Sequence, residues 1–139
     1  MIDTKITVKQ LNEMSRNTMM EHLAIEFTAI GENYVEGKMP VDHRHHQPYG
    51  LMHGGASVTL SETLGSVAAH CSIDSSKQLT VGLEINANHI KAVRSGYVYG
   101  KATPVHIGSS TQVWAITICD EKQNIVSVSR LTVSVIDKK

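Results

Sequence analysis

The sequence predicts an α+β protein in which one long helix packs against a curved antiparallel sheet. A proline-free stretch, residues 54 to about 72, predicts the helix. Its apolar residues recur at helical spacing: Val58, Leu64, Val67, Ala68 and Cys71. A hairpin pattern precedes this stretch, and long extended stretches rich in β-branched residues follow it. One helix among many strands is typical of a two-layer α+β domain.

The composition indicates a single folded domain, residues 1–139. The 139 residues are enough to enclose one sizeable core, and 41% of them are hydrophobic while 19% are charged, unlike the composition of disordered chains. The 13 basic and 13 acidic residues leave a net charge of +0, so no overall field attracts nucleic acid or an anionic membrane. We therefore expect neither as a partner, and any anion must be bound locally.

The cysteine content and the N-terminal segment predict a cytoplasmic location. Cys71 and Cys119 are too few for a disulfide framework and do not form a CxxC pair, so a reducing compartment is expected. Residues 1–10 contain no continuous hydrophobic block, which argues against a signal peptide or a membrane anchor.

Capping patterns predict two short helices near the beginning of the chain. Thr7 with Gln10, and Thr18 with Glu21, fit the capping box, in which two side chains bind each other's free backbone amides. The predicted helices are residues 8–15 and 19–22. The nearby methionines are expected to pack in the core or in a lid; they are Met14, Met19 and Met20.

Alternating patterns and turn residues predict the strands. Residues 25–30 and 34–39 alternate around a turn and predict a first hairpin, and a polar, histidine-rich loop at residues 42–49 follows. After the long helix we expect a meander of antiparallel strands. These strands are residues 79–90, 96–107 and 111–136, the last broken by a turn at residues 120–124.

The long helix is rich in small residues, among them Gly54, Gly55 and Gly65. Each glycine costs a helix up to about 1 kcal/mol relative to alanine. We therefore expect the sheet to approach this helix closely and to offset that cost.

The beginning of the long helix is suited to binding an oxyanion. Gly54 and Gly55 lie in its first turn, where backbone N–H groups have no partner in the helix and the helix dipole is positive. One well-placed donor stabilises the charge that develops on an attacked carbonyl by about 3 to 4 kcal/mol. The preceding loop brings Gln47 and His53 to the same end, and glycine lets a bulky substrate approach the backbone.

A polar stripe follows on the same helix. Gly55, Thr59, Glu62 and Ser66 are spaced by 4, 3 and 4 residues and so share one face. Glu62 lies 62 − 54 = 8 positions beyond Gly54, about 12 Å along the axis, which is too far for both to act on one carbonyl. Two such helices packed antiparallel about a two-fold axis would bring Gly54 of one chain opposite Glu62 of the other. We therefore expect an obligate dimer with two shared sites.

Three segments carry a family resemblance: residues 47–57, 61–66 and 81–89, which read QPYGLMHGGAS, SETLGS and VGLEINANH. They resemble the hotdog-fold acyl-CoA thioesterases, in particular the bacterial 1,4-dihydroxy-2-naphthoyl-CoA hydrolases and their relatives that act on aryl-CoA and enterobactin-precursor thioesters. The resemblance covers nearly the whole chain. It implies a hotdog fold, a dimer-based tetramer, hydrolysis of an acyl- or aroyl-CoA thioester, and neither a metal nor a cofactor. Menaquinone biosynthesis, proofreading of carrier-protein thioesters and general housekeeping all stay open as its role.

The resemblance also implies roles for residues of the helix and of the loop before it. Glu62 is the nucleophile or the general base. The Gly54 amide and Gln47 polarise the thioester carbonyl, and His53 aligns the thioester. Ser66 helps to place water or substrate, although a small residue at that position also suits close packing.

Coenzyme A carries several phosphate charges, so a chain without net charge needs a local site for them. Basic residues follow the predicted strand at residues 79–90, and the bend between the strands at 96–107 and 111–136 offers backbone and hydroxyl donors. Both segments resemble the nucleotide-contacting region of the family. The candidate residues are His89, Lys91, Arg94, Gly108, Ser109 and Ser110. On an extended segment, Val81 and Gly82 are expected to bind the pantetheine amides as a strand would.

Other interpretations of these residues stay open. Glu62 taken alone is also interpreted as a helix-surface carboxylate or part of an interface ion pair. A zinc cluster of His43, His45, His46 and His53 is a further alternative, although no cysteine or fixed frame supports it. A hotdog-fold hydratase or dehydratase would transfer a proton at carbon and release no CoA, and a non-catalytic acyl-CoA-binding module would leave the thioester intact.

Overall fold

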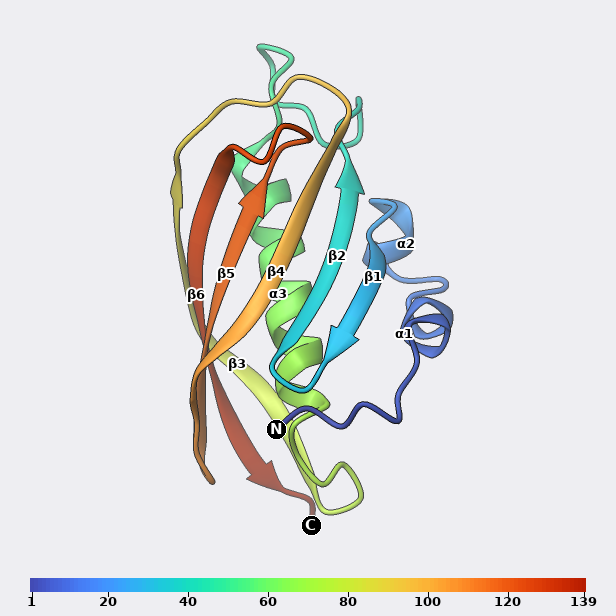
Figure 1. The fold of residues 1–139 in the computed structure, drawn as a ribbon, viewed down its shortest axis with the longest axis vertical. Helices are drawn as coiled ribbons and strands as arrows, with labels where there is room; N and C mark the ends of the chain where they lie inside the picture. Colours follow the sequence, from blue (N-terminus) through green and yellow to red (C-terminus); the bar gives the residue numbers. More distant parts are fainter.

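The structure, a computed structural model, describes residues 1–139 and confirms the predicted α+β class (Figure 1). Six antiparallel strands form one curved sheet that wraps around the long helix α3, and two short helices lie beside strand β1. In chain order the elements are α1 (Val8–Met14), α2 (Met19–His22), β1 (Glu26–Gly31), β2 (Tyr34–Pro40), α3 (Gly54–His70), β3 (Gln78–His89), β4 (Tyr97–Ile107), β5 (Thr111–Cys119) and β6 (Ile125–Asp137). No helix combines the length and the apolar character needed to cross a membrane.

Side-chain caps begin both short helices, as the sequence predicts. Thr7 and Gln10 form the complete capping box of α1. The second box is only half formed: the Thr18 hydroxyl accepts the Met20 N–H at 3.2 Å, but the Glu21 carboxylate accepts the N–H of Asn17 instead. Asn17 has a positive φ of 59°, and this turn of the chain places its N–H within reach of Glu21.

The strand order of the sheet, β1-β2-β4-β5-β6-β3, corrects the expected meander. Among the four strands that follow α3, only β4, β5 and β6 are consecutive neighbours, whereas β3 pairs with β6 at the far edge. The connection from β3 to β4 crosses the end of the sheet at which α3 begins (Figure 1). Local patterns predict strands but not this choice of neighbour, because pairing depends on contacts far apart in the sequence.

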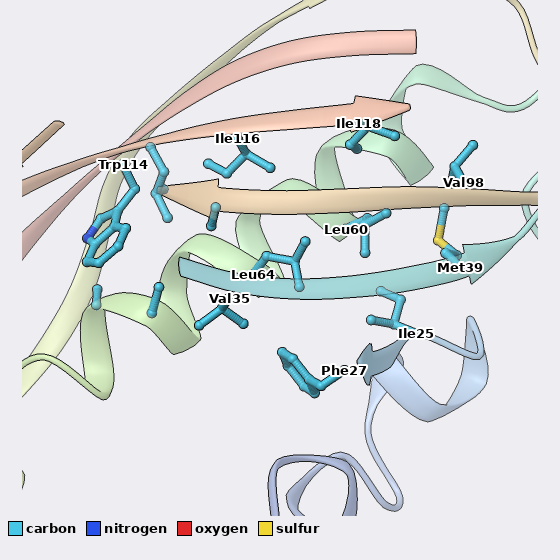
Figure 2. Close-up of a cluster of buried hydrophobic side chains, with 14 of the residues drawn as sticks. Ile25, Phe27, Val35, Met39, Leu60, Leu64, Val98, Trp114, Ile116 and Ile118 are labelled. Atoms are coloured by element: carbon cyan, nitrogen blue, oxygen red, sulfur yellow. The ribbon is translucent and has the colours of Figure 1, made fainter. Parts of the chain in front are cut away.

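The core lies between α3 and the facing side of the sheet. Figure 2 shows Leu60 and Leu64 of α3 pointing toward the strands. The fully buried side chains around them come from five strands: Phe27, Val35, Met39, Val98, Trp114, Ile116, Ile118 and Leu131. Val58 and Val67, which the sequence predicts as pocket walls, are only half-buried, whereas the small residues Ser57, Ser61 and Gly65 are buried on this face.

A pair of strand glycines explains how the sheet approaches α3 so closely. Gly37 of β2 lies directly opposite Gly100 of β4, and Leu64 enters the space between them. A Cβ atom at Gly100 would lie 2.5 Å from Leu64 Cδ1, and one at Gly37 would lie 2.8 Å from Leu64 Cδ2. The predicted close contact between helix and sheet is therefore confirmed, and it depends on glycines of the strands as well as on Gly65 of the helix.

We predict that Gly100→Ala lowers the free energy of unfolding by about 1 to 3 kcal/mol, because it overpacks the Leu64 contact. Urea unfolding followed by circular dichroism measures this change. In a Leu64→Ala background the same substitution should cost less, since the opposing side chain is gone. An equal cost in both backgrounds would show that another contact is responsible.

Candidate active site

The first turn of α3 presents free hydrogen-bond donors. His53 caps the helix: its Nδ1 accepts the Gly55 N–H at 2.7 Å, so the neutral ring carries its proton on Nε2 and presents an N–H outward. The Gly54 N–H is the first of the helix and has no acceptor within the chain. An N–H from the backbone and another from an exposed imidazole thus lie at the positive end of the helix dipole.

Gln47 lies in the loop before this helix and is half-buried. A turn fixes its backbone, since its N–H donates to Leu51 O at 2.8 Å and its carbonyl accepts the Gly50 N–H at 2.9 Å. Its side-chain oxygen accepts the Tyr49 N–H. The amide NH₂ of Gln47 therefore remains as a donor, which is the group that a substrate carbonyl requires.

The remaining histidines of the loop hold the backbone in place. His45 is buried and its Nε2 lies 2.7 Å from Leu23 O, and His46 Nε2 lies 2.7 Å from Arg94 O. With His53 serving as a helix cap, the rings are directed to separate partners. No group of three or more His, Cys, Asp or Glu side chains converges as metal ligands would.

His89, from the end of β3, lies over the N-terminus of α3. A Cβ atom at Gly54 would be 2.7 Å from His89 Nε2, so a larger residue at this position would force the imidazole to shift. A cavity of about 320 Å³ brings Gln47, Gly54, His89 and Lys91 together. The structure thus collects the carbonyl-polarising candidates with two of the proposed CoA contacts.

Glu62 lies in a second cavity, of about 330 Å³, between α2 and α3. It is half-buried and forms no ion pair with any residue of the chain. Thr59 and Ser66 line the same cavity, which confirms that these residues share one face of the helix. Gly82 of β3 faces the carboxylate, since a Cβ atom there would be 3.1 Å from Glu62 Oε1.

The two cavities keep the acid and the donors apart within one chain. Glu62 follows Gly54 by eight positions on one continuous helix, a rise of about 12 Å. No residue lines both cavities. One chain alone therefore does not bring Glu62 and the N–H donors of the first turn to a single carbonyl group.

Of the basic candidates, Lys91 is already paired with a carboxylate. Lys91 Nζ lies 2.7 Å from Asp120 Oδ2, and together with the side chain and backbone of Asn124 it holds the pKa of Asp120 well below its usual range. Arg94 is exposed beside Lys91 at the rim of a smaller cavity of about 260 Å³. A phosphate bound here would compete with Asp120 for Lys91.

The other candidates for CoA binding lie elsewhere. The Ile90 N–H bonds to Val126 O, whereas Ser110 O accepts the N–H of Val135, nine residues further along β6 and therefore about 30 Å away. The bend at Gly108, Ser109 and Ser110 thus lies at one end of the sheet. The residues at its other end are His89, Lys91 and Arg94. Val81 and Gly82 lie on β3, whose outer edge has no neighbouring strand within the chain, so its backbone groups can pair with an extended segment of another molecule.

Some residues at these cavities have no clear signal in the sequence. Met19 and Met20 of α2, together with Val67 of α3, line the Glu62 cavity. The sequence predicts Val67 as a wall of the substrate pocket, which its place beside Glu62 supports, and predicts that Met19 and Met20 pack in the core or in a lid. Met20 is half-buried against the core, whereas Met14 is 64% exposed and Met19 61% exposed. Only the docking of α2 on α3 places Met19 and Met20 near the carboxylate.

Comparison with known proteins identifies the family. Residues 49–127 match the model of the thioesterase superfamily. The chain is 48% identical over 132 residues to the 1,4-dihydroxy-2-naphthoyl-CoA hydrolase of Escherichia coli, covering 95% of this chain and 96% of that protein. It is 46% identical over 130 residues to the proofreading thioesterase EntH of Cronobacter turicensis, covering 94% of each. Its fold matches the crystal structure of a thioesterase from Haemophilus influenzae with a TM-score of 0.94 and 46% identity, over 98% of this chain and 94% of that one.

The chain therefore belongs to the thioesterase superfamily. Its curved six-stranded antiparallel sheet around a central helix is the hotdog fold, as the resemblance implies. The chain is a thioester hydrolase.

The Lys91–Asp120 pair predicts an acid-labile contribution to stability. Because the pKa of Asp120 is lowered on folding, chiefly by Lys91, its contribution is complete above the unfolded pKa of about 4 and is lost as the pH falls below it. We expect Asp120→Asn to lower the urea midpoint at pH 7, and the difference from the wild type to shrink at about pH 3. A difference that stays constant over this range would contradict the assignment.

Proposed function

We propose that the protein hydrolyses acyl-CoA thioesters with a compact, aromatic acyl group, with Glu62 as its catalytic carboxylate. One observation carries the assignment: a half-buried carboxylate without a cationic partner faces a cavity walled by methionine, valine and threonine side chains. Concave, mostly apolar cavities with a few polar groups are the usual form of a small-molecule site. No cationic residue of the same chain forms an ion pair with Glu62, and an interface ion pair would require a residue of a second copy.

The proposed site is shared between two copies of the chain. Pairing of the free β3 edge with its counterpart in a second copy would extend the sheet and place the two α3 helices side by side in opposite directions. Exposed apolar residues on β3 support such an interface: Leu79, Val81 and Leu83. The thioester carbonyl would then lie between Glu62 of one subunit and the Gly54 N–H and Gln47 amide of the other.

The proposed reaction has two parts, attack on the thioester carbonyl and departure of the pantetheine thiolate. The Glu62 carboxylate either attacks the carbonyl carbon to form a mixed anhydride or removes a proton from the water that attacks it. Negative charge then develops on the carbonyl oxygen, where the Gly54 N–H and the Gln47 NH₂ donate hydrogen bonds. The carbon–sulfur bond breaks and the pantetheine thiolate leaves. In the first route water then hydrolyses the anhydride, which releases the acid and frees Glu62; in the second the proton that Glu62 accepted from water passes to the leaving thiolate. His53 Nε2–H aligns the thioester, and Ser66 holds the water or the substrate beside Glu62.

The proposed acyl and nucleotide groups have separate support. The relative from Escherichia coli is named as a hydrolase of 1,4-dihydroxy-2-naphthoyl-CoA, and this name supports an aromatic acyl-CoA as the substrate of this chain. The relative from Cronobacter turicensis, of similar sequence identity, is named as a proofreading thioesterase. For the nucleotide, the support is the clustering of Lys91 and Arg94 at the end of β3, beyond the cavity that contains Gly54.

We predict that Glu62→Gln lowers kcat for benzoyl-CoA by about 10²- to 10⁴-fold, because the amide neither attacks nor accepts a proton. Release of CoA is followed with a thiol reagent. Glu13→Gln, on an exposed position of α1, is the matched control and should keep the wild-type rate. A Glu62→Gln enzyme with nearly native activity would refute the assignment, and substrate turnover without release of CoA would indicate a hydratase.

Mixed dimers test the shared site. Subunits with Glu62→Gln retain the donors and subunits with Gly54→Pro retain the acid, so each mixed dimer would contain one intact site. After random mixing, about a quarter of all sites should be active, since half of the dimers are mixed and each has one intact site of two. Activity that remains at the level of the unmixed variants would exclude a site built from two chains.

A further inference from the structure

The cavity beside Glu62 has two walls of different character. The wall on α3 consists of Thr59, Glu62, Thr63, Ser66 and Val67, whereas the wall on α2 consists of two methionines, Met19 and Met20. Glu62 is the only ionisable side chain among these residues. A volume of about 330 Å³ lies at the small end of the range of ligand cavities, about 300 to 1,000 Å³.

The two methionines differ in how firmly they are held. Met20 is half-buried against the core, and its sulfur lies 3.9 Å from the Ser15 hydroxyl. Met19 is 61% exposed although it forms part of the cavity wall. Methionine has three rotatable side-chain bonds and a polarizable sulfur that packs well against aromatic rings. Met20 therefore provides a fixed part of the wall and Met19 an adjustable part.

The backbone of α2, in contrast, is held in place. Arg44 Nη1 donates to His22 O at 3.1 Å, and His45 Nε2 lies 2.7 Å from Leu23 O, so the loop at residues 42–46 holds the C-terminal end of this four-residue helix. Arg44 is itself fixed by a bidentate interaction with Asp42: its Nε donates to Asp42 Oδ1 at 3.0 Å and its Nη2 to Asp42 Oδ2 at 2.7 Å. Any adjustment of the wall must therefore come from the side chains of α2.

We propose that Met19 is a specificity-determining residue: its side chain forms the movable wall against which the acyl group packs, and its size sets which acyl groups reach Glu62. The inference rests on the proposed function, in which Glu62 acts on the thioester carbonyl. The acyl group is the part of the substrate that enters this cavity, because the cavity is bounded by apolar and hydroxyl side chains and contains no cationic group that would bind a phosphate. Because the Met19 side chain must move aside for a wide acyl group, we expect a lower kcat/KM for two-ring acyl groups than for single-ring ones.

The experiment compares kcat/KM for benzoyl-CoA and 2-naphthoyl-CoA in substituted enzymes. Met19→Ala should raise the ratio of naphthoyl to benzoyl activity about tenfold because it widens the cavity, and Met19→Phe should lower that ratio about tenfold because it narrows the cavity. Met19→Leu, of similar volume, should restore the wild-type ratio. Because Met19 is mostly exposed, the variants should unfold within a few degrees of the wild type, which thermal unfolding checks.

Met14 provides the matched control. It is as exposed as Met19 and lies on α1, outside the Glu62 cavity. Met14→Ala and Met14→Phe should leave the ratio within about twofold of the wild type. An active enzyme whose ratio is unchanged by Met19→Ala and Met19→Phe would overturn the inference and leave the proposed function standing. A wild type that hydrolyses no CoA thioester would overturn both.

Discussion

The contact of Leu64 with two facing glycines is the constraint on which the rest of the structure depends. Because Gly37 and Gly100 lie directly opposite each other on β2 and β4, the sheet approaches α3 closely enough to surround one side of the helix. That side accepts only apolar or small residues, among them Ser57 and Ser61, so the one carboxylate of α3 is confined to the other side. Glu62 is consequently directed toward the cavity under α2 and toward Gly82, away from the core.

The geometry of one helix also explains why the proposed chemistry needs two chains. Free N–H donors occur only in the first turn of a helix, because every later N–H is bonded within it. Glu62 lies more than two turns further on, beside a cavity that shields the carboxylate on one side. An antiparallel copy of the helix brings these two features together without any change in either. The unpaired edge of β3 is where such a copy would extend the sheet.

The features of the fold that depend on residues close together in the sequence are predictable. Where prediction and structure agree, the reason is local. Thr7 and Gln10 form the expected box because both partners belong to one turn. The stripe of Thr59, Glu62 and Ser66 is fixed by helical periodicity. The half-formed box at Thr18 shows the limit of such rules, because the turn at Asn17 gives Glu21 another partner.

The sequence by itself determined the class of fold, the bounds of the elements to within a few residues, and the face of α3 on which the carboxylate lies. The roles of the site residues rest on a resemblance as well as on spacing. Tertiary structure alone decided that β3 pairs with β6, that His89 covers Gly54, and that Met19 approaches Glu62. Each of these is a contact between segments more than thirty residues apart in the chain. Such contacts follow from the shapes of packed surfaces, which a local pattern of residues does not encode.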